Sequence, residues 1–177
     1  MTIHLDFIDL YPTAHPEATV QRLGFPLDHP YIEHCWTPIV GPSSVALLRH
    51  CVWRWQDAVP ARVQAGDLAA EIGLGRGTTG NGPLWHTMTR LERFRLVSLG
   101  ETGSEMRVYT QVPPLGPRQL DRLTGWSRAR HERLLGQHLD ALAAAGKPDE
   151  PPSHVRMTAR LDRLSTNAVT PSRTLGR

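Results

Sequence analysis

Residues Ala65–Val112 read AGDLAAEIGLGRGTTGNGPLWHTMTRLERFRLVSLGETGSEMRVYTQV, and this stretch decides the fold. It begins with a short apolar pattern of helical spacing, which Gly73 and Gly75 end. A glycine-broken connection then leads to a longer helix that opens with Pro83. Two β-like runs follow and flank a short turn. The order predicts two helices joined by a glycine-rich corner, with a β-hairpin behind them.

The longer helix, expected over residues of about 81–94, has two different faces. Leu84, Met88 and Leu91 recur at i, i+4 and i+7 and form a core stripe, which Phe94 continues. The polar residues on the other side are His86, Thr89, Arg90 and Arg93. The charged outer face of a helix often contacts only water. The position of this face after a glycine-rich corner favours instead a role in binding another molecule.

The hairpin is expected from residues 95–99 and 106–112, with the tip at residues 100–105. Trp85, early in the longer helix, is expected to pack on this hairpin. Upstream, residues of about 45–57 have an apolar stripe at helical spacing, and Pro60 ends that helix. Residues 31–40 are expected to pack on this upstream helix. The predicted fold class is mainly α with a small β-hairpin (α+β).

Four parts are expected along the chain. Frequent prolines predict an extended N-terminal arm over residues 1–30. The helical domain with its hairpin covers residues 31–115, and a long apolar helix covers residues 116–145. A flexible basic tail covers residues 146–177. This helix can pack on its own domain or against a second copy of the chain. Because a domain of this size offers little room for so long a helix, we expect the helix to mediate a homodimer.

Part of the decisive stretch resembles a known family. Leu68-Ala69-Ala70-Glu71-Ile72-Gly73-Leu74 and Leu91-Glu92-Arg93-Phe94-Arg95-Leu96-Val97 resemble the two helix signatures of MarR-like winged helix-turn-helix regulators. Arg95 stands where those proteins usually have glycine. The resemblance covers about 50 residues and implies a DNA-binding transcriptional regulator whose second helix, here about 81–94, enters the major groove.

A fainter likeness covers residues 36–48. Trp36-Thr37-Pro38-Ile39-Val40-Gly41-Pro42 followed by Leu47-Leu48 is similar to the start of the DnaD-type primosomal winged-helix domain, which implies self-association. The arginine- and proline-rich style is similar to actinobacterial and actinophage proteins.

The resemblance to winged-helix regulators also implies which residues touch DNA. The side chains expected at base edges are those of Thr79, Asn81, His86 and Arg90, since arginine pairs with guanine and asparagine with adenine. The side chains expected at phosphates are Arg76, Arg93 and Arg107. Glu101 and Glu105 flank the hairpin tip and would repel phosphate, so Arg107 is preferred to the tip itself.

An alternative use of the same fold is protein interaction, as an adaptor in a replication, phage or transcription complex. Residues 1–40 carry five acidic residues and one basic residue, although the whole chain has a formal net charge of +3. The acidic arm, the acidic hairpin tip and the apolar helix over residues 116–145 are the surfaces that would bind a protein partner. The sequence leaves both uses open.

Enzyme, metal and membrane functions are not expected. The glycines of residues 73–80 match neither a Walker motif nor a dinucleotide fingerprint, and no nucleophile elbow occurs. The pairs His34-Cys35 and His50-Cys51 lack zinc-finger spacing, so we expect buried thiols rather than a metal site. No cofactor is implied. There is no run of 18 apolar residues and no signal-peptide pattern, so a cytoplasmic protein is expected.

Overall fold

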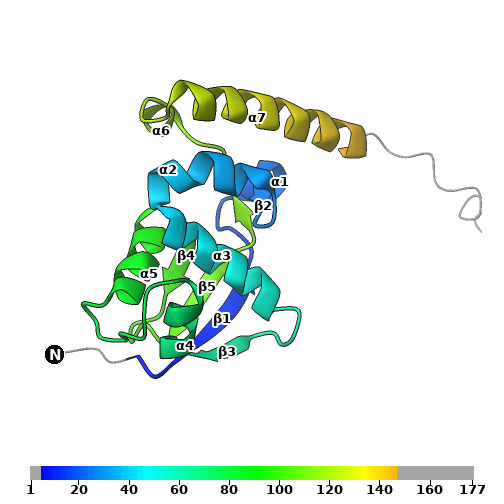
Figure 1. Cartoon of the computed structure of the whole chain (residues 1–177). Coiled ribbons are helices and arrows are strands. Elements are labelled where there is room, and N and C mark those ends of the chain that lie inside the picture. The colour runs from blue at the N-terminus through cyan, green and yellow to red at the C-terminus, as the bar shows by residue number, and fades with distance from the viewer. Residues whose placement is uncertain (1–4, 147–177) are drawn as a thin grey trace, which may run out of the picture. The chain divides into compact units, whose positions relative to one another are not determined.

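The computed structural model describes residues 5–146 of the chain (Figure 1). Helices account for 52% and strands for 17%, which confirms the α+β class. Residues up to Leu139 form one compact unit, and a second unit begins at Asp140. The tail predicted over residues 146–177 lies outside the described residues except for Gly146. In the described part, no helix is both long and apolar enough to cross a membrane.

A four-stranded sheet is the centre of the first unit. Its order is β3 (Ala61–Gln64), β1 (Phe7–Thr13), β5 (Glu105–Tyr109) and β4 (Val97–Leu99). β1 runs antiparallel to β3 and parallel to β5, and β4 and β5 form the predicted antiparallel hairpin. Because side chains alternate along a strand, Ile8 and Leu10 of β1 enter the core while Asp9 faces outward.

Three helices supply the other half of the core. They are α3 (Pro42–Arg54), α4 (Ala65–Glu71) and α5 (Pro83–Arg93), close to the three predicted helices (Figure 1). The predicted stripe of Leu84, Met88 and Leu91 is fully buried. It joins apolar side chains of α3 and of the sheet in one cluster, which fixes the opposite face of α5 toward the outside.

The sequence predicted an extended arm over residues 1–30, but the described part of it, residues 5–30, belongs to the domain. β1 lies in the middle of the sheet, and α1 (Ala18–Leu23) follows it. β2 (Phe25–Pro26) then pairs with β6 (Gln111–Val112), whose residues had been assigned to the hairpin. Local periodicity shows that residues 5–10 can be extended. It does not show that β1 pairs with strands about 50 and 100 positions away.

Residues 32–40 form a π-helical turn, η1 (Ile32–Trp36), and then α2 (Thr37–Val40). Both contact α3, which confirms the predicted packing of residues 31–40. Trp36 is buried, and its indole N–H donates to the carbonyl oxygen of Pro113 over 3.1 Å. This contact attaches the segment after the hairpin to the segment before α3.

The hairpin turn packs on the N-terminal part of α5, as predicted for Trp85. Gly103 has φ +73° and lies against the Trp85 ring so closely that a Cβ atom at this position would overlap it. Glu92 of α5 also accepts a hydrogen bond from the Leu99 amide, over 2.9 Å. The hairpin is therefore held against α5 by both an aromatic ring and a carboxylate.

The long helix predicted over residues 116–145 is two helices, α6 (Pro117–Leu120) and α7 (Gly125–Gly146). The Gln119 side chain turns back to accept from the Gly116 amide over 2.7 Å. The Thr124 hydroxyl caps α7 by accepting from the Ser127 amide. The chain thus bends at residues 121–124, where a periodic apolar pattern alone predicted a continuous helix.

Histidines of α7 hold its first half against the segment around β2. His131 Nδ1 lies 2.6 Å from the Tyr31 hydroxyl, and His138 Nε2 lies 3.1 Å from the carbonyl oxygen of Gly24. The Phe25 ring stacks on Tyr31 and His138, with ring centroids 3.8 Å and 4.3 Å away. This face of α7 is therefore occupied within its own chain, while dimerisation through the rest of the helix stays a prediction.

Stability is expected to fall as the pH drops below about 6.5, because His29 and His131 of this cluster are removed from water. Burial lowers the pKa of both groups below the ordinary 6.5. For His29, nearby His138 and Arg49 add to the effect and Asp28 opposes it; for His131, Glu132 opposes it. The folded state prefers both rings neutral, so its stability is complete above 6.5 and declines as pH falls below that value.

Urea unfolding of the full chain at several pH values measures this loss. The variant His29→Gln/His131→Gln should show a flatter dependence over the same interval, because it takes up fewer protons on unfolding. An equal slope in the variant and the unsubstituted protein would contradict the assignment.

Candidate functional site

The outer face of α5 gathers three of the seven residues predicted to contact DNA. His86, Arg90 and Arg93 are exposed and, with Thr89, line one shallow hollow of about 350 Å³. They share a face because positions i, i+4 and i+7 repeat every turn of a helix. The Thr89 hydroxyl donates to the Trp85 carbonyl of its own helix. The hollow is therefore lined mainly by one imidazole and two guanidinium groups.

Both arginines of this face are oriented by neighbouring groups. Arg90 donates from Nη1 to the Val40 carbonyl oxygen over 3.3 Å, at the corner between α2 and α3. The Arg93 guanidinium lies over the ring of Phe94, 5.5 Å from its centroid. Neither contact neutralises the positive charge, because a carbonyl and an aromatic ring carry no net charge.

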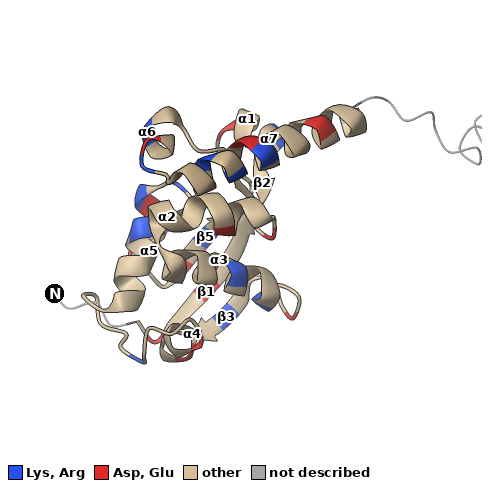
Figure 2. Ribbon diagram, turned by 45° about the horizontal axis from the view of Figure 1, so that its top comes forward, with Lys and Arg blue, Asp and Glu red and all other residues tan. Residues whose placement is uncertain are grey.

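Ion pairing separates this face from six other arginines of the described chain. Six arginines lie within 4 Å of a carboxylate: Arg49, Arg54, Arg62, Arg76, Arg95 and Arg107. Within residues 5–146, Arg90 and Arg93 form no such pair, and neither do Arg118 and Arg122 of the α6 region. Figure 2 shows the basic positions of α5 and α6 one above the other at the left of the view. These four charges remain available to an anion.

Arg76, Thr79 and Asn81 lie in the connection between α4 and α5 and not in the α5 hollow. Arg76 forms an ion pair with Asp67, with Nη1 2.6 Å from Oδ1. The carbonyl oxygen of Thr79 accepts from the Gly82 amide, and Asn81 is exposed. The structure thus gives Arg76 a carboxylate partner that the sequence did not reveal.

Arg107 is on the outer surface of the sheet, opposite the side that enters the core. Its side chain is 60% exposed and lies 2.7 Å from Glu105, two residues earlier on the same strand face. The sequence could have revealed this ion pair, because residues two positions apart on a strand lie on the same face of the sheet. An arginine already paired with a carboxylate is a weaker phosphate ligand than Arg90 or Arg93.

The sequence analysis did not single out Arg118 and Arg122. Both are exposed and line a second hollow, of about 660 Å³, together with Phe94, Gly116, Pro117 and Gln119. Their separation by four residues was compatible with a shared helix face. The bend after α6, however, is what brings them to the end of α5.

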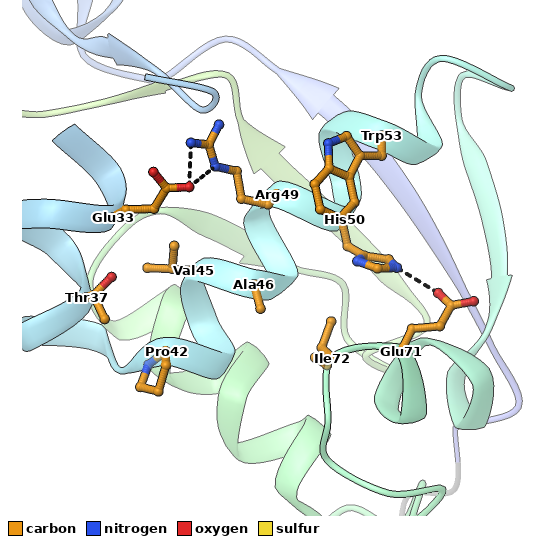
Figure 3. A pocket seen from close by; sticks show the side chains of 10 residues that line it. All are labelled: Glu33, Thr37, Pro42, Val45, Ala46, Arg49, His50, Trp53, Glu71 and Ile72. Atoms are coloured by element: carbon orange, nitrogen blue, oxygen red, sulfur yellow. Dashed lines mark hydrogen bonds and ion pairs between the residues drawn. The ribbon is translucent and has the colours of Figure 1, made fainter. Parts of the chain in front are cut away.

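A mostly apolar groove runs along α3 (Figure 3). It has a volume of about 590 Å³, and its walls come from η1, α2, α3 and α4. Pro42, Val45, Ala46 and Ile72 lie in its apolar part, and the Trp53 side chain at its rim is 57% exposed.

Ion pairs border this groove. Arg49 binds Glu33 over 2.6 Å, and Glu71 accepts from both His50 and Arg54. The hydrogen bond from Arg54 is the main reason that the pKa of Glu71 is lowered. The apolar helix named from the sequence as a protein-binding surface does not line this groove, whereas Glu33 of the acidic segment over residues 1–40 does.

The two cysteines are buried free thiols, as predicted. Burial raises the pKa of Cys35 to about 11 and of Cys51 to about 12, so neither is a thiolate near neutral pH. Among the described residues, no group of three histidine, cysteine or acidic side chains is arranged to hold a metal ion.

Comparison with known proteins finds no family model that matches this chain, and no curated protein or solved structure that is similar to it.

Proposed function

We propose that this protein is a winged helix-turn-helix transcriptional regulator that binds double-stranded DNA through α5. The observation that carries the proposal is the unpaired basic face of His86, Arg90 and Arg93. The order of α3, α4, α5 and a β-hairpin along the chain supports the proposal, because the elements of a winged helix-turn-helix module follow one another in this order. A helix with a cationic outer face fits the major groove, where arginine hydrogen-bonds guanine.

In this proposal the DNA-reading residues are fewer than the sequence suggested. Arg90 and His86 are assigned to base edges and Arg93 to phosphate. Thr79 and Asn81, which precede α5, are placed at the edge of the interface. Arg76 and Arg107 contribute less, because Asp67 and Glu105 already neutralise them. A cytoplasmic homodimer is part of the proposal, with the dimer formed by surfaces of α7 that its own chain leaves exposed.

Arg90→Ala/Arg93→Ala is expected to weaken binding to a mixed-sequence DNA duplex about tenfold or more at low salt, because two cationic contacts are lost. Fluorescence anisotropy across a salt series measures the effect. The matched control is Arg22→Ala/Arg62→Ala, which removes two exposed arginines of α1 and β3, outside both α5 and α7.

Three outcomes are distinguishable. Loss in the α5 variant alone supports the proposal, and equal loss in both variants attributes binding to net charge rather than to α5. Absence of binding by the unsubstituted protein at low salt rejects DNA binding.

If the protein binds DNA, selection from a random DNA pool should identify its target sequence. Arg90→Ala alone should then reduce the discrimination between bases at one position of that target by about 1–3 kcal/mol.

The second candidate function is a protein-interaction module, and the α3 groove is the observation that favours it. An exposed Trp53 beside an apolar groove is typical of the aromatic anchors at protein interfaces. Failure of DNA binding together with a stoichiometric protein partner that is lost in Trp53→Ala would select this function.

A further inference from the structure

A mostly apolar hollow beside the C-terminal end of α5 is bordered by two arginines. We call it the Phe94 hollow; it is lined by Phe94, Gly116, Pro117, Arg118, Gln119 and Arg122, and its volume is about 660 Å³. Arg93 of α5 also contacts the Phe94 ring, because its guanidinium group lies over that ring. The ring is fixed from behind by an edge-on contact with buried Trp36, 6.2 Å between centroids. Arg118 and Arg122 therefore line the same hollow as an aromatic ring that already carries a third arginine, Arg93.

The charge of the Phe94 hollow is not cancelled by its neighbours. In the described part of the chain, Arg93, Arg118 and Arg122 have no carboxylate within ion-pair distance. Glu92, the acidic residue of α5, is turned toward the hairpin and accepts from the Leu99 amide. Asp121 is exposed and pairs with neither arginine of the α6 region. The concentration of unpaired guanidinium groups favours a ligand with several negative charges.

We infer that the Phe94 hollow binds the phosphodiester backbone of the DNA that α5 reads, so that the α6 region supplies the phosphate contacts expected of the hairpin. This inference rests on the proposed function. The hairpin itself is poorly suited: Glu101 and Glu105 flank its turn, and Arg107 is paired with Glu105. Arg118 and Arg122 lie instead at the other end of α5.

The dimensions agree with this assignment. α5 has 11 residues and is therefore about 16 Å long, and phosphates follow one another at a rise of about 3.4 Å along each strand. A helix in the groove with cations at its C-terminal end can thus contact the phosphates beyond the bases that it reads. Phosphate contacts fix register and orientation without reading sequence, so the Phe94 hollow should affect affinity rather than specificity.

The test compares the salt dependence of binding to several duplexes of different sequence for the full chain and four variants. Arg118→Ala/Arg122→Ala removes the two cations, Arg118→Lys/Arg122→Lys keeps their charge, Arg90→Ala/Arg93→Ala removes the cations of α5, and Arg22→Ala/Arg62→Ala is the charge-matched control. Loss of two phosphate contacts should reduce the slope of log affinity against log salt by about 1.8. The lysine variant should keep most of the slope, and thermal unfolding checks that all variants fold.

The inference is supported if the alanine variant of the α6 region shows the smaller slope, with equal weakening on every sequence, and the lysine variant and the control do not. It is overturned, while the proposed function stands, if this variant behaves like the control but Arg90→Ala/Arg93→Ala loses affinity. If the unsubstituted protein binds no duplex at low salt, both proposals fail. A change of base preference in the Arg118→Ala/Arg122→Ala variant would also overturn the inference, because it would mean that these arginines contact bases.

Discussion

Tyr31→Phe is expected to lower the free energy of unfolding by about 2–5 kcal/mol, because one buried hydroxyl satisfies two other polar groups. The hydroxyl accepts from the Leu115 amide over 2.9 Å, and it donates to His131 Nδ1 over 2.6 Å. Tyr31 is fully buried and His131 nearly so. Phenylalanine would leave an amide hydrogen and an imidazole nitrogen without partners, each at a cost of about 1–3 kcal/mol.

The substitution isolates the hydroxyl from the packing of the ring. Phenylalanine keeps the parallel stacking of residue 31 on Phe25, where the two rings are inclined by 5°. Tyr11→Phe is the matched control, since the half-buried Tyr11 hydroxyl has no hydrogen-bond partner among residues 5–146. Urea unfolding followed by circular dichroism measures both, and the control should change by less than about 0.5 kcal/mol. Equal effects of the two substitutions would show that the Tyr31 hydroxyl does not hold α7 and the segment after β6 together.

Gly103→Ala is expected to destabilise the protein by about 2–5 kcal/mol, and Gly75→Ala by only about 1–2 kcal/mol. Both glycines have positive φ, +73° and +71°, where an L side chain adds about 1–2 kcal/mol of strain. At Gly75 nothing lies within 4 Å of an added Cβ, whereas at Gly103 that atom would overlap the Trp85 ring. Displacing a packed ring adds about 1–3 kcal/mol.

The difference between these two alanine variants therefore measures the contact between the hairpin and α5. Thermal or urea unfolding of the full chain gives both values under the same conditions. If Gly103→Ala costs no more than Gly75→Ala, then Trp85 does not press against the hairpin turn, and the hairpin is attached to α5 by the Glu92 contact and the shared apolar core.

The sequence was sufficient where structure depends on neighbours along the chain. Leu84, Met88 and Leu91 repeat at the helical period, and they are buried as predicted because one face of an amphipathic helix must leave water. The outward position of His86, Arg90 and Arg93 then follows from the same helix geometry. The hairpin was also predicted, since glycine, serine and threonine between two β-like runs favour a turn.

The sequence was insufficient where structure depends on distant partners. β1 is extended by its own composition, but its place between β3 and β5 requires pairing with residues that are far away in the chain. The pairing of Arg76 with Asp67, across the corner between α4 and α5, is likewise invisible to periodicity. The same holds for the bend that brings Arg118 and Arg122 beside Phe94.

By itself, the sequence determined the helices, the hairpin and the cationic face of α5, because helical spacing and turn chemistry act between residues a few positions apart. Only the tertiary structure decided which of the predicted cations stay free. Coulomb interaction depends on distance in space, so carboxylates brought by folding neutralise Arg76 and Arg107 and leave Arg90, Arg93, Arg118 and Arg122 for a ligand.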